Sequence, residues 1–273
     1  MNPIRNAGRT VQVTEKTCRQ ALVPSGIPGM EYCLNPYTGC THACVYCYAR
    51  FMMRFAKTSE PWGSFVHPKL NCPERLVAQL RRMKPRKVMI SSVTDAYQPA
   101  EADYGITRSC LGLLVETRST ISILTKSALV LRDKDILRKC PGCEVGFSIT
   151  TLDDRIAGII EPGASPPSER IEALRELGEA GIRTWVFISP VLPGITDSEE
   201  MFAAIAHAAQ AAGAQRIACD PLSFYPAAVS GIRHVLDRDL PEFREAFETA
   251  VRDPAGYCSR LRMLAQKYGV EMV

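Results

Sequence analysis

Short apolar or β-branched runs alternate with amphipathic helical patterns along most of this chain. The runs typical of strands occupy residues 31–35, 87–92, 121–126, 144–150, 183–189 and 216–220. Helical patterns separate most of them, at 73–84, 107–117, 131–139, 168–181 and 197–213. Strands joined through helices form parallel βαβ units with right-handed crossovers. The alternation predicts an α/β fold, either an open doubly wound sheet or a barrel with two of the usual eight units missing.

The length of 273 residues exceeds that of an ordinary domain but fits one α/β barrel with additions. Residues 1–29 show neither the strand nor the helix periodicity and carry prolines and glycines near their end. We therefore expect an irregular N-terminal extension. The strand pattern stops after about residue 221, and residues 240–253 and 256–269 have the pattern of two closing helices. We therefore predict an extension (1–29), a core domain (30–221) and a C-terminal helical segment packed on the core (222–273).

The composition indicates a cytoplasmic protein with no membrane segment. The first residues lack the apolar stretch of a secretory signal, and no apolar run approaches the roughly 18 residues of a membrane span. The chain has 11 cysteines, and because the cytosol keeps thiols reduced, metal binding or catalysis explains them better than disulfides do. The net charge of +4 is a weak bias toward anionic partners. One basic run is interpreted as a solvated helix end: Arg81, Arg82, Lys84, Arg86 and Lys87.

Three cysteines with the spacing C-x3-C-x2-C follow the first predicted strand: Cys40, Cys44 and Cys47. Loops after strands are where α/β folds place their chemistry, and closely spaced thiolates suit an iron–sulfur cluster. A zinc site needs four ligands, for which His42 is the local candidate, and an electron-transfer cluster needs four cysteines. Three thiolates would leave one iron of a cubane open to another ligand.

The stretch NPYTGCTHACVYCYAR at 35–50 resembles the cluster motif of radical S-adenosylmethionine enzymes, and more narrowly of their spore photoproduct lyase-like branch. Four further stretches agree with that family in order and position: TDAYQPAE after the second strand, TKS after the third, and SITTLDD with IEP and ERIEAL around the fourth. The resemblance covers roughly residues 30–220. It implies a partial (β/α)6 barrel of the TIM type, with the C-terminal helices added to it.

The resemblance also implies a [4Fe–4S] cluster on Cys40, Cys44 and Cys47, with S-adenosylmethionine bound to the open iron. Reductive cleavage of that cofactor would give a 5′-deoxyadenosyl radical that takes a hydrogen atom from a substrate. The residues that it assigns to S-adenosylmethionine are Thr94, Asp95, Lys126, Ser127, Ser148 and Thr150. Tyr46 and Tyr48 correspond to a tyrosine pair of the lyase branch, one of which relays a hydrogen atom. Further candidates are Gln98, Glu101, Glu161 and Arg170.

Each of these residue types also has a plain structural interpretation. Thr94 and Asp95 suit the cap of a turn, and Lys126 suits a surface position where its ammonium reaches water. Tyr46 and Tyr48 suit packing. Glu161 and Arg170 suit an ion pair on the outside of the fold.

The other cysteines limit the resemblance. The lyase uses a cysteine after the second strand as a hydrogen donor, and SSVTDAY has none there. Cys219, at the end of the sixth strand, is the substitute catalytic candidate, with a buried packing thiol as the alternative. Cys140 and Cys143 form a C-x2-C before the fourth strand, on the barrel face opposite the site, and suit a second metal site only if another pair joins them. The remaining cysteines have no assigned partner: Cys18, Cys33, Cys72, Cys110 and Cys258.

The sequence thus predicts a radical S-adenosylmethionine enzyme with a photoproduct-lyase-like core. A reducing protein such as flavodoxin or ferredoxin would be its partner, and nucleic acid and peptide are the substrate classes considered. The alternatives are a peptide-modifying or small-molecule-modifying enzyme with the same core, a non-catalytic iron–sulfur electron carrier, and a nucleic-acid-binding protein with a structural cluster.

Overall fold

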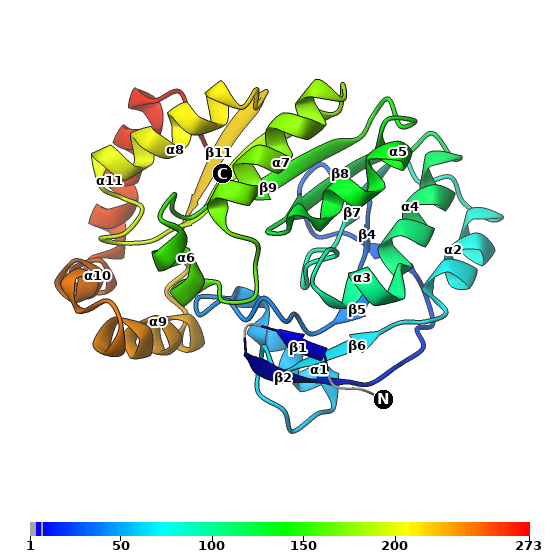
Figure 1. The fold of residues 1–273 in the computed structure, drawn as a ribbon, viewed down its shortest axis with the longest axis horizontal. Helices are drawn as coiled ribbons and strands as arrows, with labels where there is room; N and C mark the ends of the chain where they lie inside the picture. The colour runs from blue at the N-terminus through cyan, green and yellow to red at the C-terminus, as the bar shows by residue number, and fades with distance from the viewer. Residues whose placement is uncertain (1–3, 7) are drawn as a thin grey trace.

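The computed structural model describes residues 4–6 and 8–273, which form a large sheet, a small sheet and surrounding helices (Figure 1). The large sheet contains, in chain order, β3 (Leu22–Pro24), β4 (Tyr32–Leu34), β7 (Lys87–Ile90), β8 (Thr120–Thr125), β9 (Glu144–Ser148), β10 (Arg183–Val191), β11 (Arg216–Pro221) and β12 (Glu271–Met272). The small sheet contains β1 (Ile4–Asn6), β2 (Arg9–Val13), β5 (Tyr37–Thr38) and β6 (Phe65–Pro68).

The six predicted strands are the parallel centre of the large sheet. They lie side by side in chain order, β4-β7-β8-β9-β10-β11, and each pairs with the next in parallel. A doubly wound sheet would reverse its strand order at one point, and this sheet does not. Its two edge strands, β3 and β12, do not pair with each other within the described residues. The α/β prediction is confirmed, and the architecture is the incomplete barrel.

Helices follow the strands as the periodicity predicts, and several more occur. The helical segments are η1 (Tyr48–Met52), α1 (Met53–Ala56), α2 (Cys72–Leu80), α3 (Ala100–Tyr104), α4 (Ile106–Val115), η2 (Ala128–Asp133), α5 (Lys134–Leu137), α6 (Asp154–Ile160), α7 (Pro167–Glu179), α8 (Glu199–Ala211), α9 (Pro226–Arg238), η3 (Pro241–Phe243), α10 (Arg244–Arg252) and α11 (Pro254–Lys267). The sequence did not predict α6 or α9, and both lie near the three-cysteine loop. Among the described helices, none has the length and apolarity that crossing a bilayer requires.

Two predictions about the ends of the chain are wrong. The segment 1–29 is not irregular where it is described, because β1 and β2 pair with each other, β2 pairs with β6, and β3 pairs antiparallel with β4. Residues 1–3 and 7 of that segment lie outside the described residues. The strand pattern does not end at 221 either, since β12 adds to β11 in parallel. Three of these strands, β1, β3 and β12, have only two or three residues, too few for an alternating pattern to appear in the sequence.

The strand centres form one apolar core. Ile90, Ile123 and Phe147 have no exposed surface, as expected of parallel strands covered on both faces. Gly146 of β9 is needed there, because a Cβ at this position would lie 2.3 Å from the indole ring of Trp185 on β10. The polar residues predicted for the site follow these apolar runs, at the carboxyl ends of the strands.

Candidate active site

The three-cysteine loop lies between β5 and η1, and residues that follow β7 hold its first half. The carbonyl oxygen of Gly39 accepts hydrogen bonds from Thr94 Oγ1 at 2.6 Å and from Gln98 Nε2 at 3.1 Å. The other amide atom, Gln98 Oε1, accepts the backbone N–H of Thr41 at 3.0 Å. Gln98 is fully buried, so its amide joins the second strand's loop to the start of the cysteine loop.

Two helices that the sequence did not predict hold the second half of the loop. The N–H of Val45 donates to the carbonyl of Ile160 at the end of α6, at 2.9 Å. Tyr225, the residue before α9, donates its hydroxyl to the carbonyl of Cys47. Gly231 of α9 faces the same loop, because a Cβ there would lie 2.4 Å from the carbonyl oxygen of Val45. The C-terminal helices therefore position the cysteines as well as covering the core.

Gly39, next to the first cysteine, is under two constraints. Its φ is +84°, and a Cβ would lie 2.6 Å from the carbonyl oxygen of Phe65. We expect Gly39→Ala to lower the free energy of unfolding by at least about 3 kcal/mol, as the sum of left-handed backbone strain and overpacking. Gly29→Ala is the matched control, since Gly29 has φ +79° and nothing within 4 Å of the added Cβ; it should lose about 1–2 kcal/mol. Equal losses in urea unfolding of the two variants would show that the contact with Phe65 relaxes.

Two cavities open at the carboxyl ends of the strands and share part of their walls. The smaller has a volume of about 120 Å³ and is lined by Cys40, His42, Cys44, Cys47, Tyr48, Ala49, Trp62, Ser92, Val93, Thr94, Asp95, Leu124 and Lys126. The larger has a volume of about 380 Å³ and is lined by Cys44, Tyr46, Cys47, Tyr48, Lys126, Ser189, Pro190, Asp220, Pro221, Leu222 and Ser223. The three predicted cluster cysteines therefore meet at one cavity, and two of them also face its larger neighbour.

The donor set at the smaller cavity fits an iron–sulfur cluster. Burial raises the pKa of all three thiols, that of Cys44 to about 12. A neutral buried thiol gives up its proton when a cationic metal group replaces it, and soft thiolates are the ligands that iron–sulfur clusters take. Three such donors on one cavity wall suit a cluster that keeps one iron for another ligand.

His42, the candidate fourth ligand of a zinc site, faces a carboxylate. Its Nδ1 lies 3.4 Å from Asp95 Oδ2, and burial lowers the pKa of the imidazole. Within residues 4–6 and 8–273, no three side chains of the His, Cys, Asp and Glu types converge as a single metal ion requires.

Asp95 and Thr94 line the smaller cavity and also organise the strand ends. Asp95 Oδ1 accepts the N–H of Tyr97 at 2.8 Å, which is the turn cap considered from the sequence, and the hydroxyl of Thr125 at 2.8 Å. Its Oδ2 accepts the backbone N–H of Lys126, also at 2.8 Å. Asp95 therefore joins the ends of β7 and β8 at the cavity, and its assignment to S-adenosylmethionine stays a prediction.

Lys126 directs a half-buried ammonium toward both cavities. Its Nζ lies 5.7 Å from the centroid of the Tyr46 ring, within cation–π range. No carboxylate pairs with this ammonium anywhere in the part of the chain that the structure describes. A cavity-wall cation that has no protein anion beside it can bind an anionic group such as a ligand carboxylate. Binding the methionine carboxylate is the role that the resemblance implies for Lys126.

The other residues assigned to S-adenosylmethionine lie beside these cavities and not in their walls. Ser127 Oγ accepts the N–H of Leu129 at 3.2 Å and caps η2. The carbonyl of Ser148 accepts a hydrogen bond from Arg170 at 2.8 Å. Thr150 Oγ1 donates to Glu161 at 2.9 Å. These contacts position neighbouring residues, and the cofactor roles of the three hydroxyls stay predictions.

A buried ion pair supports Tyr46, and it lies inside the fold where the sequence suggested the outside. Arg170 and Glu161 are 0% and 1% exposed, and a guanidinium nitrogen of Arg170 donates to Glu161 Oε2. Glu161 Oε1 accepts the Tyr46 hydroxyl and that of Thr150. Burial alone would raise the pKa of Glu161, but the charges of Arg170 and Lys126 and these hydrogen bonds outweigh it and lower the pKa. Glu161 therefore holds Tyr46 as an ionised carboxylate.

Glu101, the remaining candidate after β7, lies outside both cavities. It is fully buried and accepts hydrogen bonds from the hydroxyl of Tyr37 and from Arg132. These contacts make it a structural group that joins α3 to β5 and η2.

The two other residues predicted to be catalytic, Tyr48 and Cys219, lie in different surroundings. Tyr48 lines both cavities, is 55% exposed, and donates its hydroxyl to the carbonyl of Ser92. Cys219 is fully buried in the core, where burial raises the pKa of its thiol to about 12, and it lines neither cavity. The geometry of Cys219 is that of the alternative, a packing thiol. The residue after it, Asp220, is the one that reaches the larger cavity.

Some site residues gave no usable signal in the sequence. Tyr225 and Asp220 follow or end the sixth strand, and the cis peptide between Ser189 and Pro190 lies at the end of the fifth. Their position at strand ends was the only indication that they belong to the site, because active sites of α/β barrels lie at the carboxyl ends of the strands.

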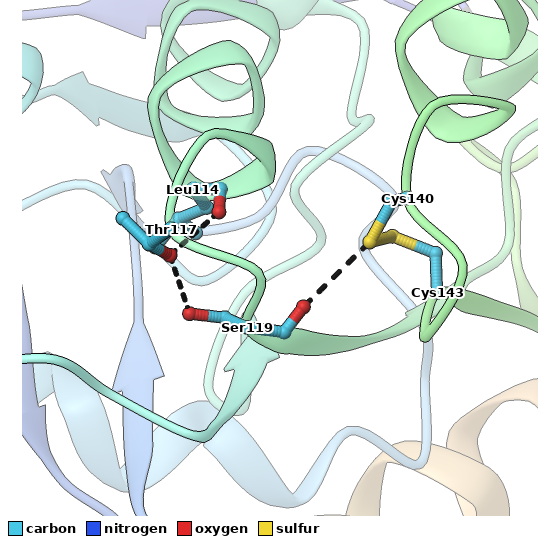
Figure 2. The surroundings of a disulfide bond; sticks show 5 residues. All are labelled: Leu114, Thr117, Ser119, Cys140 and Cys143. Carbon is cyan, nitrogen blue, oxygen red and sulfur yellow. Dashed lines mark hydrogen bonds between the residues drawn. A yellow bond between two sulfur atoms is a disulfide. The ribbon is translucent and has the colours of Figure 1, made fainter.

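The predicted C-x2-C pair forms a disulfide, against the expectation that the thiols of this chain stay reduced. Cys140 and Cys143 are bonded at the turn before β9, and Cys140 Sγ lies 3.7 Å from the carbonyl oxygen of Ser119 (Figure 2). The turn is at the amino end of β9, opposite the cysteine loop, as predicted. The covalent bond between the two sulfurs removes them as metal ligands in this state.

Three of the unassigned cysteines meet outside the site. Cys110 Sγ lies 3.8 Å from Cys72 Sγ, and a hydrogen bond with Cys72 raises the pKa of Cys18. They come from the segment after β2, from α2 and from α4, so only the tertiary fold brings them together. Asn71 joins the same contact, because its side chain accepts the N–H of Cys18 at 2.8 Å.

Comparison with known proteins agrees with this geometry. The model of the radical SAM superfamily matches residues 34–206. An uncharacterized protein of Methanocaldococcus jannaschii is 40% identical over 189 residues, which cover 69% of this chain and 71% of that protein. A protein of Pseudomonas phage M6 named radical SAM Nα-GlyT isomerase is 27% identical over 169 residues. The matched residues are 61% of this chain and 34% of the phage protein.

The fold has solved counterparts as well. A spore photoproduct lyase variant with bound S-adenosylmethionine and dinucleoside spore photoproduct superposes with a TM-score of 0.66 at 16% identity, over 95% of this chain and 81% of that one. The family model covers the cysteine loop and the parallel strands β7, β8, β9 and β10, and the motif cysteines meet at one cavity. This chain belongs to the radical SAM superfamily.

Proposed function

We propose that this protein is an enzyme in which Cys40, Cys44 and Cys47 hold a [4Fe–4S] cluster that binds S-adenosylmethionine. The observation that carries the proposal is that all three thiols and the Lys126 ammonium line one cavity at the carboxyl ends of the strands. Three soft donors suit the cluster, and a free cation next to them suits the carboxylate of the cofactor's methionine part. The larger cavity, which shares Cys44, Cys47 and Lys126, is the place for the substrate.

When bound on Cys40, Cys44 and Cys47, the cluster would supply one-electron reduction, and S-adenosylmethionine would supply the group that abstracts hydrogen. The chain's own residues bind, orient and exclude water. Lys126 would hold the methionine carboxylate, and Thr94 and Asp95, in the same cavity wall, would bind its amine. Glu161 fixes the hydroxyl of Tyr46 at the wall between the loop and the larger cavity. Tyr46 and Tyr48 then border the space in which hydrogen transfer would take place.

The reductive cleavage of S-adenosylmethionine tests this proposal. We expect the anaerobically reconstituted protein, reduced with dithionite and given S-adenosylmethionine, to release 5′-deoxyadenosine, measured by chromatography and mass spectrometry. Lys126→Met should raise the S-adenosylmethionine concentration that is needed for cleavage, because the neutral side chain loses the carboxylate contact. Lys84→Met, in the exposed segment between α2 and β7, should not. A reduced protein with an intact cluster and no 5′-deoxyadenosine would instead be an electron carrier, and the proposal would be wrong.

We propose hydrogen abstraction with a lyase-like outcome, in which the radical starts a bond rearrangement in the substrate. The phage relative is named an isomerase, and one solved structural neighbour holds a dinucleoside spore photoproduct. A reducing protein such as flavodoxin or ferredoxin would deliver the electron. We place the protein in the cytoplasm, where a reducing environment suits the cluster thiols and the free cysteines. A peptide-modifying or small-molecule-modifying enzyme with the same core is the alternative outcome.

A further inference from the structure

Exposed aromatic side chains gather on the segment that follows the cysteine loop. Tyr48 is 55% exposed, Phe51 44% and Phe55 62%. The other large apolar side chains that are exposed in the described residues are aliphatic and scattered: Val23, Ile27, Leu70, Met263 and Val273. Single exposed apolar residues are ordinary, but three exposed aromatic rings within eight residues are a concentration that favours a binding role for this segment.

The same segment carries unpaired positive charge. Arg50, Arg54 and Lys57 lie on it, and the sequence has no acidic residue between Asn35 and Glu60. None of these three cations has a carboxylate partner in the described part of the chain. The guanidinium carbon of Arg54 lies 5.9 Å from the centroid of the Phe55 ring, beside an aromatic face and not an acid. We call Tyr48–Lys57, which spans η1 and α1 (Figure 1), the aromatic–basic ridge.

The ridge is continuous with the candidate active site. Tyr48, its first residue, lines both cavities while more than half of its surface is exposed. The preceding residue, Cys47, is a predicted cluster ligand in the wall of both cavities. A polymer lying along the ridge therefore has one end of its contact surface at the mouth of the larger cavity.

We propose that the aromatic–basic ridge binds single-stranded nucleic acid and leads one of its bases to the larger cavity. Exposed aromatic rings stack with bases whatever their identity, and arginine and lysine neutralise phosphates. A duplex hides the base faces that these rings need, so a single strand is the form that fits. An acidic reductase would match the charge, but it would need neither three exposed rings nor an opening to the larger cavity. The role of the ridge in presenting a substrate rests on the proposed function, whereas the binding itself does not.

Fluorescence anisotropy with a dye-labelled, mixed-sequence single-stranded oligonucleotide of about 12 nucleotides tests the binding. For three phosphate contacts, the slope of log Kobs against log salt should be about −2. Arg54→Ala/Lys57→Ala should leave a slope of about −0.7, and Phe51→Ala/Phe55→Ala should weaken binding at least about tenfold with the slope unchanged. The two changes thus separate charge from stacking.

Matched controls come from exposed residues elsewhere on this chain. Arg81→Ala/Arg82→Ala removes the same charge from the exposed end of α2, where no exposed aromatic residue lies, and Met263→Ala removes an exposed apolar side chain from α11. Both should bind the oligonucleotide within about twofold of the parent protein. Thermal unfolding followed by circular dichroism checks that every variant is folded.

Three outcomes would overturn the proposal: no binding at low salt, equal losses in the ridge variants and the Arg81/Arg82 control, or equal competition by a poly-glutamate peptide, which would indicate an acidic protein partner. Formation of 5′-deoxyadenosine by the same variants distinguishes the two proposals. Ridge variants that cleave S-adenosylmethionine but do not bind the oligonucleotide support both. Oligonucleotide binding by a protein that never forms 5′-deoxyadenosine leaves the ridge proposal standing and contradicts the proposed function.

Discussion

Replacing Cys44 by alanine is expected to abolish assembly of the iron–sulfur cluster. Cys44, the middle cysteine of the motif, lines both cavities. The residue is 8% exposed, in a loop held at both ends. With two thiolates left, no other cysteine of the described chain faces the smaller cavity to replace it. Iron and sulfide analysis after anaerobic reconstitution should therefore fall from about four of each per chain to background.

Cys140→Ala is the matched control for that loss. Cys140 is also a mostly buried cysteine in a short-spaced motif, but it belongs to the turn before β9 at the opposite end of the strands. The variant should bind iron and sulfide as the parent protein does. Retention of the cluster in Cys44→Ala, or its loss in Cys140→Ala with the fold intact, would show that the metal site is not the loop between β5 and η1.

Replacing Arg170 by methionine is expected to lower the free energy of unfolding by about 3–5 kcal/mol. The guanidinium is fully buried, and besides Glu161 it donates to the carbonyls of Ser148 and Ser165 at 2.8 and 2.7 Å. Its removal leaves the Glu161 carboxylate buried without its main counter-charge, which costs far more than the loss of an exposed pair. Urea unfolding followed by circular dichroism measures the change.

Two further variants show whether the buried charge is the cause. Arg175→Met breaks an exposed pair with Glu172 on the same helix, α7, and should cost no more than about 1 kcal/mol. Glu161→Gln combined with Arg170→Met removes both charges and should recover part of the stability lost by Arg170→Met alone. A double variant at least as unstable as the sum of the two single variants would mean that packing of the long side chain, and not charge, dominates.

The strands were predictable because their signal is local. Each run such as residues 121–126 carries enough β-branched and apolar residues to reveal a buried strand, and the six predicted strands form the parallel centre of the sheet. The spacing of Cys40, Cys44 and Cys47 is likewise fixed by the chain, so their meeting at one cavity needed only a loop in that place. Short strands such as β1 and β12 carry too few residues for such a pattern.

Contacts between distant segments were not predictable in this way. An outside ion pair between Glu161 and Arg170 was one interpretation of the sequence, but their burial depends on how α6 and α7 pack against β9. Cys219 was a candidate for the site, with a buried thiol as the alternative, and it lies in the core. Successive side chains of a strand point to opposite faces, so a shift of one position decides between the two. No sequence pattern distinguished two cysteine contacts either: the disulfide of Cys140 with Cys143 and the contact of Cys72 with Cys110.

By itself, then, the sequence of this protein determined the parallel α/β core, the thiol trio and the strand ends at which chemistry would occur. Those features depend on the periodicity and spacing of a few consecutive residues. Local backbone geometry fixes where neighbouring side chains point, so such patterns can be interpreted from the sequence. Only the tertiary structure decided that Lys126 stands free beside the thiols, that Glu161 holds Tyr46 from inside the fold, and that the aromatic residues after Cys47 remain exposed at the cavity mouth. Burial and charge pairing depend on which distant elements pack together. That packing is determined by the close-packed core as a whole and not by any one segment.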